Sequence, residues 1–248
     1  MNDLDILRDM ANQLKLSTLK TSIMKFIEEA EQGSETYKEF LFKILKAEVE
    51  RKEKDALRNR IKRARFPYTK EIESFDTTFQ KSIDKTKINI LKEMKWIDNM
   101  YNLIFLGPPG VGKSHLMIGL GYRATELGYH VLFLTMSELI FFLKNKNNCR
   151  KSKEVINRLN KCDVLMIDEV GYIPLTKEDA NLFFEIVSGL HEKTSICITS
   201  NKDFSQWTEL LQDEALATAI LDRLVYRCQV FNLKGNSYRL ENRETIFK

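Results

Sequence analysis

The first group of residues with types and spacing suited to chemistry is a glycine-rich loop. Residues 107–114, GPPGVGKS, satisfy the Gly-x4-Gly-Lys-Ser/Thr pattern. Backbone N–H groups of such a loop surround phosphate oxygens, its lysine reaches the β- and γ-phosphates, and its hydroxyl coordinates Mg²⁺. A glycine-rich turn without a ligand is the alternative. The predicted nucleotide-binding residues are Gly107, Pro108, Pro109, Gly110, Val111, Gly112, Lys113, Ser114 and His115, with Ser114 also a Mg²⁺ ligand.

An acidic pair forms the second group. The apolar run 164–167 predicts a buried strand that delivers Asp168 and Glu169 to the edge where α/β sheets bind ligands. Asp168 is the second candidate Mg²⁺ ligand, and Glu169 is the candidate base that polarises a water molecule. A carboxylate pair that only caps a loop is the alternative. A base aimed at water suits an ATPase rather than a nucleotide kinase.

A single amide forms the third group. In TSICITSN an apolar run ends at Ser200 and Asn201 follows it. An amide at this edge can hydrogen-bond the γ-phosphate or the attacking water, although Asn after a strand is also a common turn residue. Asn201 is therefore a candidate catalytic residue, together with Lys113 and Glu169.

The elements that must position these groups alternate along the chain. Short β-rich runs at 102–106, 130–135, 164–168, 195–200 and 228–233 are separated by segments with helical spacing. This alternation predicts an α/β domain over residues 101–248, with a five-stranded parallel sheet and helices on both of its faces.

The residues before this domain predict a different organisation. Residues 1–66 show helical spacing, broken at Gly33-Ser34, and predict a small all-helical domain. Phe66-Pro67 marks its end, because the residue before proline is pushed out of helical geometry. Residues 67–100 form a predicted connector with one helix over 87–98.

Charge is unevenly distributed along the 248 residues, whose formal net charge is +4. Residues 1–50 carry 7 basic and 10 acidic side chains, a net charge of −3. Residues 51–66 carry 8 basic and 2 acidic side chains, a net charge of +6. Residues 144–158 carry 6 basic and 1 acidic side chain, hence +5. Either basic segment alone could be a solvated face. Two basic segments in one nucleotide-binding protein favour a polyanionic partner such as nucleic acid.

Composition gives further expectations about the setting. The four cysteines (149, 162, 197 and 228) show no C-x-x-C spacing, which favours buried free thiols and a reducing cytoplasm. No apolar run is long enough to span a membrane, so no membrane partner is expected. The N-terminus lacks the basic start of a secretory signal.

Longer stretches resemble the IstB-like group of AAA+ ATPases, the ATP-binding helpers of bacterial insertion sequences and relatives of the DnaC/DnaI-type helicase loaders. The stretches are LGPPGVGKSHL, DVLMIDEVGYIPL, CITSNKDFSQW, AILDRLVYRC and GNSYRLENR, with N-terminal segments that bring the resemblance to essentially the full length. The first two are generic to P-loop ATPases, while DEVGYIPL and GNSYR point to this group. Ser114 stands where many relatives have Thr, which keeps the hydroxyl.

The resemblance implies an ATPase that uses ATP and Mg²⁺, self-associates into a ring or helical oligomer and acts with a partner transposase on target DNA. In LDRL, Arg223 corresponds to the arginine finger that reaches a neighbour's γ-phosphate, with Arg227 as the fallback. Pairing of Arg223 with an acid on its own helix is the alternative. In GNSYRLENR, Arg239 is a weaker candidate for a phosphate sensor in its own subunit.

The resemblance also gives the basic segments a role in contacting duplex DNA. The predicted DNA-binding residues are Arg58, Lys62, Arg63, Arg65, Lys144, Lys146, Arg150, Lys151 and Lys153.

Two other functions stay open on the sequence. A helicase loader would share the ATP site and bind a helicase through its N-terminal domain, but the absence of cysteines before Cys149 disfavours the zinc-bearing loaders. A small-molecule phosphotransferase would need an acceptor site, for which the sequence offers no candidate.

Overall fold

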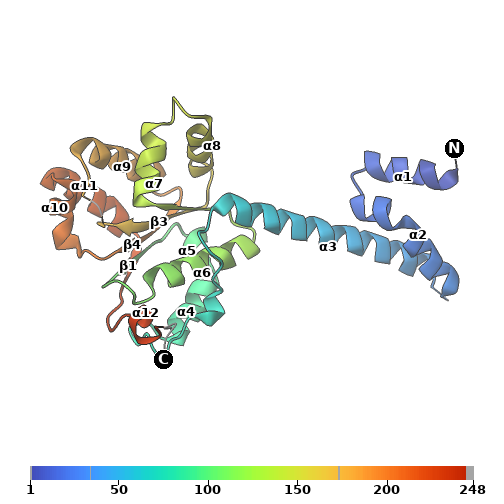
Figure 1. Cartoon of the computed structure of the whole chain (residues 1–248), viewed down its shortest axis with the longest axis horizontal. Coiled ribbons are helices and arrows are strands. Elements are labelled where there is room, and N and C mark those ends of the chain that lie inside the picture. The colour runs from blue at the N-terminus through green and yellow to red at the C-terminus, as the bar shows by residue number, and fades with distance from the viewer. Residues whose placement is uncertain (1, 34, 173, 244–248) are drawn as a thin grey trace. The chain divides into compact units, whose positions relative to one another are not determined.

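The computed structural model describes residues 2–33, 35–172 and 174–243. The chain divides into two compact units, residues 1–59 and 60–248. Helix α3 runs through the point of division, because it spans Tyr37–Ala64 (Figure 1).

The first unit is entirely helical, as the sequence predicts. Helices α1 (Asp3–Gln13) and α2 (Ser17–Gln32) precede α3, and the predicted break lies between α2 and α3, although Ser34 itself is outside the described residues. Ile23, Phe26 and Ile44 are buried here. One carboxylate is also buried: Glu48, 3% exposed, accepts a hydrogen bond from the backbone N–H of Leu19 at 2.8 Å. This bond satisfies an otherwise unpaired N–H in the first turn of α2.

A parallel sheet organises the second unit. Its five strands lie in the order β2-β3-β4-β1-β5, and every neighbouring pair is parallel. The strands are β1 (Asn102–Leu106), β2 (Val131–Thr135), β3 (Val164–Val170), β4 (Ser195–Ser200) and β5 (Cys228–Asn232). The predicted α/β class and the predicted five-stranded parallel sheet are confirmed.

Helices cover both faces of the sheet (Figure 1). One face packs against α7 (Met136–Lys144), α8 (Arg150–Leu159), α9 (Lys177–Leu190), α10 (Trp207–Leu211) and α11 (Glu214–Val225). The other packs against α4 (Lys85–Lys92), α5 (Lys95–Asp98), α6 (Lys113–Glu126) and the short η1 (Ile72–Ser74). Two short elements complete the unit: η2 (Phe204–Gln206) and α12 (Tyr238–Glu241).

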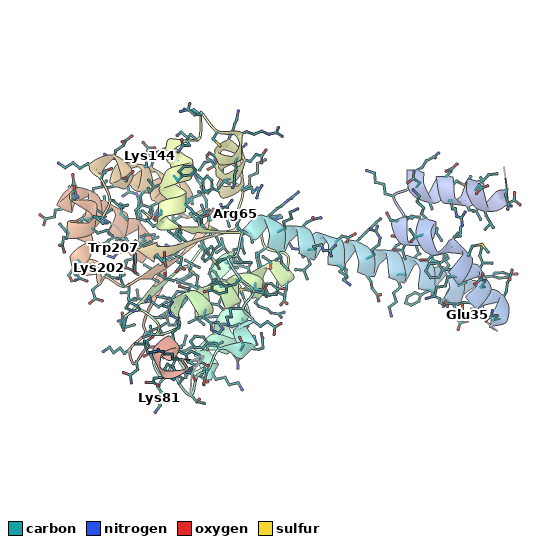
Figure 2. The ribbon with its side chains drawn as sticks, viewed as in Figure 1. Glu35, Arg65, Lys81, Lys144, Lys202 and Trp207 are labelled. Carbon is teal, nitrogen blue, oxygen red and sulfur yellow. The ribbon has the colours of Figure 1, made fainter. Side chains whose placement is uncertain are left out.

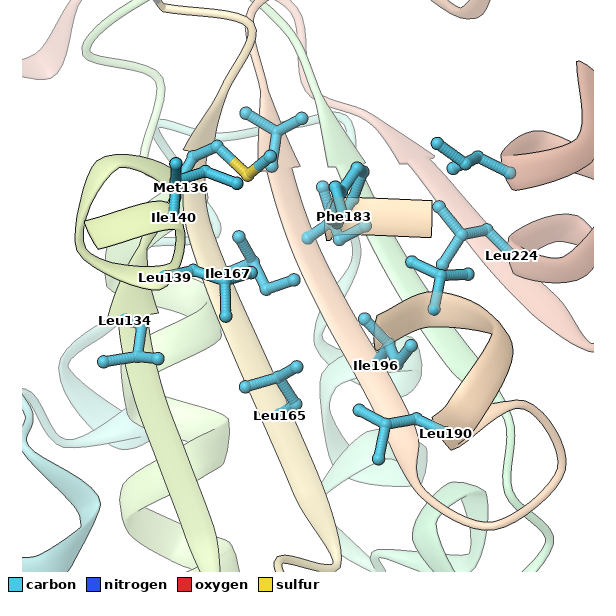
Figure 3. Packing of buried hydrophobic residues seen from close by; sticks show 14 of the residues in the cluster. Leu134, Met136, Leu139, Ile140, Leu165, Ile167, Phe183, Leu190, Ile196 and Leu224 are labelled. Carbon is cyan, nitrogen blue, oxygen red and sulfur yellow. The ribbon is translucent and has the colours of Figure 1, made fainter. Parts of the chain in front are cut away.

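Alternation along the strands explains the two apolar cores. In β3, Leu165 and Ile167 face the α7–α11 side, whereas Val164 and Met166 face the α6 side. Figure 3 shows Leu165 and Ile167 on their strand within the first core. Because both faces are covered, the strands are nearly continuous apolar runs rather than alternating ones.

The connector differs from the prediction. The single helix expected over residues 87–98 is two helices, α4 and α5, separated by Met94 in a left-handed conformation with φ 59°. Met94 is fully buried, and the indole N–H of Trp96 donates to the carbonyl oxygen of Leu91 at 3.0 Å. Packing of these apolar side chains against α6 therefore outweighs the local preference for one helix.

Candidate functional site

The glycine-rich loop connects the end of β1 to the start of α6, as its pattern predicts. Gly107 (φ 144°) and Gly110 (φ 86°) adopt backbone conformations that other residues rarely take. A Cβ at Gly107 would overlap the carbonyl oxygen of Leu233, and one at Gly110 would overlap the side chain of Ser237. The loop therefore needs glycine at both positions for two reasons, its backbone conformation and its close neighbours.

Lys113 is the first residue of α6 and lies partly buried beneath the loop. Its ammonium donates to the carbonyl oxygens of Gly107 at 2.7 Å and Pro108 at 2.8 Å. Burial lowers the pKa of Lys113; the nearby carboxylate of Asp168 opposes that shift, and the guanidinium of Arg239 adds to it. An anionic ligand in the loop would favour the charged lysine.

Asp168 joins three elements at the end of β3. The hydroxyl of Ser114 donates to Asp168 Oδ1 at 2.8 Å, and the hydroxyl of Thr199 in β4 donates to the same oxygen. Asp168 is 7% exposed. The hydroxyl oxygen of Ser114 and the carboxylate oxygen of Asp168 lie side by side, and both are hard oxygen ligands. These two residues therefore fit a Mg²⁺ ion.

Glu169 stands beside Asp168 but points differently, because the strand bulges here. The register of β3 with β4 shifts between Ile167 and Val170, and Glu169 has φ 63°. Its backbone N–H donates to the hydroxyl of Thr199 at 3.0 Å, while its side chain is exposed. The bulge thus turns one carboxylate toward Ser114 and leaves the next free to meet solvent.

The connector supplies a wall of the site that the sequence did not reveal. A cavity of about 1060 Å³ is lined by the loop, Asp168, Glu169 and several connector residues, among them Tyr68, Phe75, Phe79 and Gln80. The buried amide of Gln80 donates to the carbonyl oxygen of Val111 in the loop at 3.0 Å. No periodicity in residues 67–80 could have indicated these contacts.

His115 lies against this same wall. Its ring stands at 82° to that of Phe75, with centroids 5.5 Å apart, and its Nε2 lies 3.2 Å from the hydroxyl oxygen of Ser74. Burial, and then the charge of Lys70, lower the pKa of His115. The ring therefore packs on the connector, and His115 lines the same cavity as the loop.

The C-terminal segment closes another side of the cavity. The N–H of Tyr238 donates to the carbonyl oxygen of Gly110 at 3.0 Å, and the ring of Tyr238 lies edge-on to Phe79 at 5.0 Å. Arg239 lines the same cavity. The GNSYR stretch therefore lies directly on the phosphate loop.

The chain matches a protein family over almost its whole length. The family model described as IstB-like ATP binding protein covers residues 9–245. This chain belongs to that family. The resemblance noted in the sequence is confirmed.

Two relatives show the extent of the similarity. The chain is 38% identical, over 98% of its length and 91% of the relative's, to a protein of Pseudomonas aeruginosa named for ATP binding and for insertion sequence IS21. It is 37% identical, over 96% of its length and 94% of the relative's, to a similarly named protein of insertion sequence IS5376 from Geobacillus stearothermophilus. ATP is therefore the ligand that the family indicates.

Solved structures show the fold. The chain superposes on the crystal structure of DnaI with TM-score 0.56 and 21% identity, over 66% of this chain and 91% of that one. The crystal structure of the DnaC helicase loader gives TM-score 0.51 and 21% identity, over 60% of this chain and 87% of that one. These neighbours therefore share the fold of this chain over about two-thirds of its length.

Asn201 and Arg223 occupy different places. Asn201 directly follows β4 and lines the cavity, as expected of a residue near the γ-phosphate. Arg223 lies on α11 and does not line this cavity: it donates to the carbonyl oxygen of Ala219 at 2.8 Å, and its guanidinium lies 4.8 Å from the ring centroid of Phe184. Among the described residues it forms no ion pair, so the expected alternative, an acid on its own helix, is not found.

The predicted DNA-binding residues divide into free and engaged ones. The exposed members without an ion pair in the described ranges are Arg58, Lys62, Arg63, Lys146, Lys151 and Lys153. Arg150 is exposed, with its Nε 3.1 Å from Glu154.

Two of the predicted DNA-binding residues make contacts that the sequence did not indicate. Lys144 is held 2.6 Å from Asp179, which neutralises its charge locally. Arg65 is only 22% exposed, pairs with Glu138 at 2.8 Å and lines the cavity (Figure 2 labels both basic residues). A bond to a DNA phosphate would have to replace these contacts, and the DNA-binding role of both residues stays a prediction.

No helix in the described ranges combines the length and the apolar character needed to cross a membrane.

Proposed function

We propose that this chain hydrolyses ATP and assembles on duplex DNA as the helper of an insertion-sequence transposase. The observation that carries the proposal is the meeting of Lys113, Ser114, Asp168 and Glu169 at one sheet edge in a member of the IstB-like family. The relatives' names associate the family with ATP and with insertion sequences.

Each residue of the edge has a proposed task in hydrolysis. Lys113 would exchange its carbonyl partners for phosphate oxygens, and Ser114 and Asp168 would hold Mg²⁺, which neutralises phosphate charge when bound. Glu169 would act as the base toward water, and Asn201 would orient that water or the γ-phosphate. The exposure of Glu169 suits a group that must meet a water molecule.

The place of Arg223 supports the proposal of self-association. Because this guanidinium lies outside its own subunit's cavity, a role in hydrolysis requires a second subunit. Planar, permanently charged arginine suits a phosphate oxygen. We propose that Arg223 completes a neighbour's site in a ring or helical oligomer, with Arg227 as the fallback, and that Arg239 contacts phosphate within its own subunit.

DNA binding is proposed to arise from the exposed basic residues at the end of α3 and around the start of α8. A single subunit neutralises few phosphates and should bind weakly. An oligomer repeats these contacts, which sums them into strong binding with little sequence preference.

A helicase loader stays the second candidate. The structural similarity to DnaI and DnaC supports only the shared fold at 21% identity. The names of the relatives, at 37 and 38% identity over nearly the full length, favour the transposition role.

The decisive experiment measures binding to random duplex DNA by fluorescence anisotropy, with Mg²⁺-ATP and with Mg²⁺-ADP, across a salt series. We expect binding that requires ATP and weakens steeply between about 50 and 200 mM salt. Neutralising Lys146, Lys151 and Lys153 to Gln should flatten the salt dependence.

The matched control removes the same charge elsewhere. Lys81, Lys85 and Lys193 are exposed and lie outside both basic segments, so their replacement by Gln should leave the slope nearly unchanged. Equal affinity in ATP and ADP, or no binding at low salt, would remove DNA-coupled assembly and favour a protein partner such as a helicase.

A further inference from the structure

Arg65 has an unusual conformation at the end of α3. It is the first residue after the helix and has φ 65°, a left-handed conformation that residues with a side chain rarely adopt. Such a conformation persists where surrounding contacts hold it, and it often marks a working part of the protein. The sequence predicts only that this arginine is basic.

The guanidinium of Arg65 is held on two sides. Nη2 donates to Oε1 of Glu138 at 2.8 Å, and Cζ lies 4.9 Å from the ring centroid of Phe142 in α7. Its Nε is buried and has no hydrogen-bond partner in the part of the chain that the structure describes. This cation, which lines the cavity, therefore carries a buried donor without a partner among the described residues.

Glu138 connects Arg65 to the edge that carries the acidic pair. Its second oxygen, Oε2, accepts from the N–H of Thr135 at 3.1 Å, and Thr135 Oγ1 accepts from the N–H of Glu138 at 3.2 Å. This reciprocal pair caps the start of α7. Thr135 ends β2 opposite Asp168 of β3. A short path of contacts thus runs from Asp168 to Arg65.

The two elements that this ion pair joins both lead to exposed basic residues. Lys62 and Arg63 occupy the last turn of α3, and only Ala64 separates Arg63 from Arg65. Helix α7 begins beside Glu138 and ends at Lys144, two residues before Lys146 (Figure 2 labels Arg65 and Lys144). Any shift of the Arg65 side chain therefore acts on the end of α3 and on the start of α7 together.

We propose that the Arg65–Glu138 ion pair positions the end of α3 and the start of α7 according to the nucleotide in the cavity. A polyphosphate adds negative charge on the side where Arg65 lines the cavity, and it competes with Glu138 for this cation. Arg65 would then have two arrangements, one paired with Glu138 and one bound to phosphate. The nucleotide shifts the population from the first to the second only to the extent that phosphate binds the second more tightly. Arg65 is thus a positioning residue, and the proposal rests on the proposed binding of ATP at this site.

Hydrogen–deuterium exchange tests the proposal without any need for DNA. Peptides from the loop, the last turns of α3 and α7 are followed with and without saturating Mg²⁺-ATP. In the parent protein we expect ATP to change exchange in all three. Glu138→Gln keeps an oxygen for the N–H of Thr135 but loses the ion pair, so it should retain the response of the loop and lose at least about two-thirds of the response in α3 and α7.

Two further variants separate this effect from a loss of helix stability. Thr135→Ala removes the cap hydroxyl and keeps the Arg65–Glu138 pair, so all three responses should remain. Arg65→Lys should keep part of the response in α3 and α7, since it retains the charge, whereas Arg65→Met should lose it. An unchanged response in Glu138→Gln and Arg65→Met, or a parent in which ATP affects the loop alone, would overturn the proposal.

Nucleotide-dependent DNA affinity is the second readout. The ratio of affinities in ATP and ADP should fall about 5-fold in Glu138→Gln, at the lower end of usual coupling between two sites. If the parent protein binds DNA with equal affinity in ATP and ADP, the DNA role is contradicted, but the exchange result still stands. A failure of the loop to respond to ATP contradicts the proposed nucleotide site itself.

Discussion

Replacement of Thr199 by Val tests the arrangement of the acidic pair most directly. Thr199 is 1% exposed, and its hydroxyl makes two bonds: it donates to the carboxylate of Asp168 and accepts from the N–H of Glu169 at 3.0 Å. Valine has nearly the same shape but can make neither bond. The substitution therefore removes the tether of both acidic residues without opening a cavity.

The size of the effect follows from these two bonds. A hydrogen bond to a charged group contributes about 1.5–3 kcal/mol and a neutral one about 0.5–1.5 kcal/mol. The methyl group that replaces the hydroxyl returns about 1 kcal/mol by apolar burial. We expect Thr199→Val to lower the free energy of unfolding by about 1–3.5 kcal/mol. Loss of the anchor on Glu169, whose φ is 63°, should also reduce ATP hydrolysis by about 10²-fold.

Thr199→Ser is the matched control, because it keeps the hydroxyl and loses only a methyl group. It should cost about 0.5–1.5 kcal/mol and retain most of the hydrolysis rate. Urea unfolding gives the free energies, and release of phosphate from Mg²⁺-ATP gives the rates. The reasoning fails if the Val variant is as stable and active as the parent, or if Ser is the more damaging of the two.

Three other outcomes are expected. Glu169→Gln should bind ATP like the parent but hydrolyse it at least about 10²-fold more slowly, measured by equilibrium binding and phosphate release; turnover at the parent rate would show that Glu169 is not the base. Arg223→Ala and Lys113→Ala should each be inactive, yet a mixture of the two variants should recover some hydrolysis. At one kind of subunit junction in the mixed oligomer, an intact Lys113 site meets an intact Arg223 from the neighbour. No recovery at any ratio of the two folded proteins would argue against an arginine finger acting between subunits. At pH 8 a thiol reagent should label Cys149 well before Cys162. The N–H groups at the start of α8 lower the pKa of Cys149, although its side chain makes no capping hydrogen bond, whereas burial raises the pKa of Cys162 to about 12. Equal labelling rates in the native state would contradict this placement.

The sequence by itself determined the sheet and the residues that lie at its edge. The loop over residues 107–114 and the acidic pair after an apolar run are local patterns, and each works through residues adjacent in the chain. Their positions follow from one rule, that parallel strands end at the same edge. For this reason the strands, the loop and the contact between Ser114 and Asp168 could be expected from the order of the residues alone.

Only the tertiary structure decided the walls of the cavity and the surroundings of single basic residues. Gln80 reaches the carbonyl of Val111, the backbone of Tyr238 holds that of Gly110, and Arg65 meets Glu138, which lies 73 positions further along the chain. No local pattern records such pairs, because burial and distance across the fold select the partner. Arg65 looks like one more member of a basic segment in the sequence, and its place beside an acid and an aromatic ring, at the wall of the cavity, separates it from its neighbours.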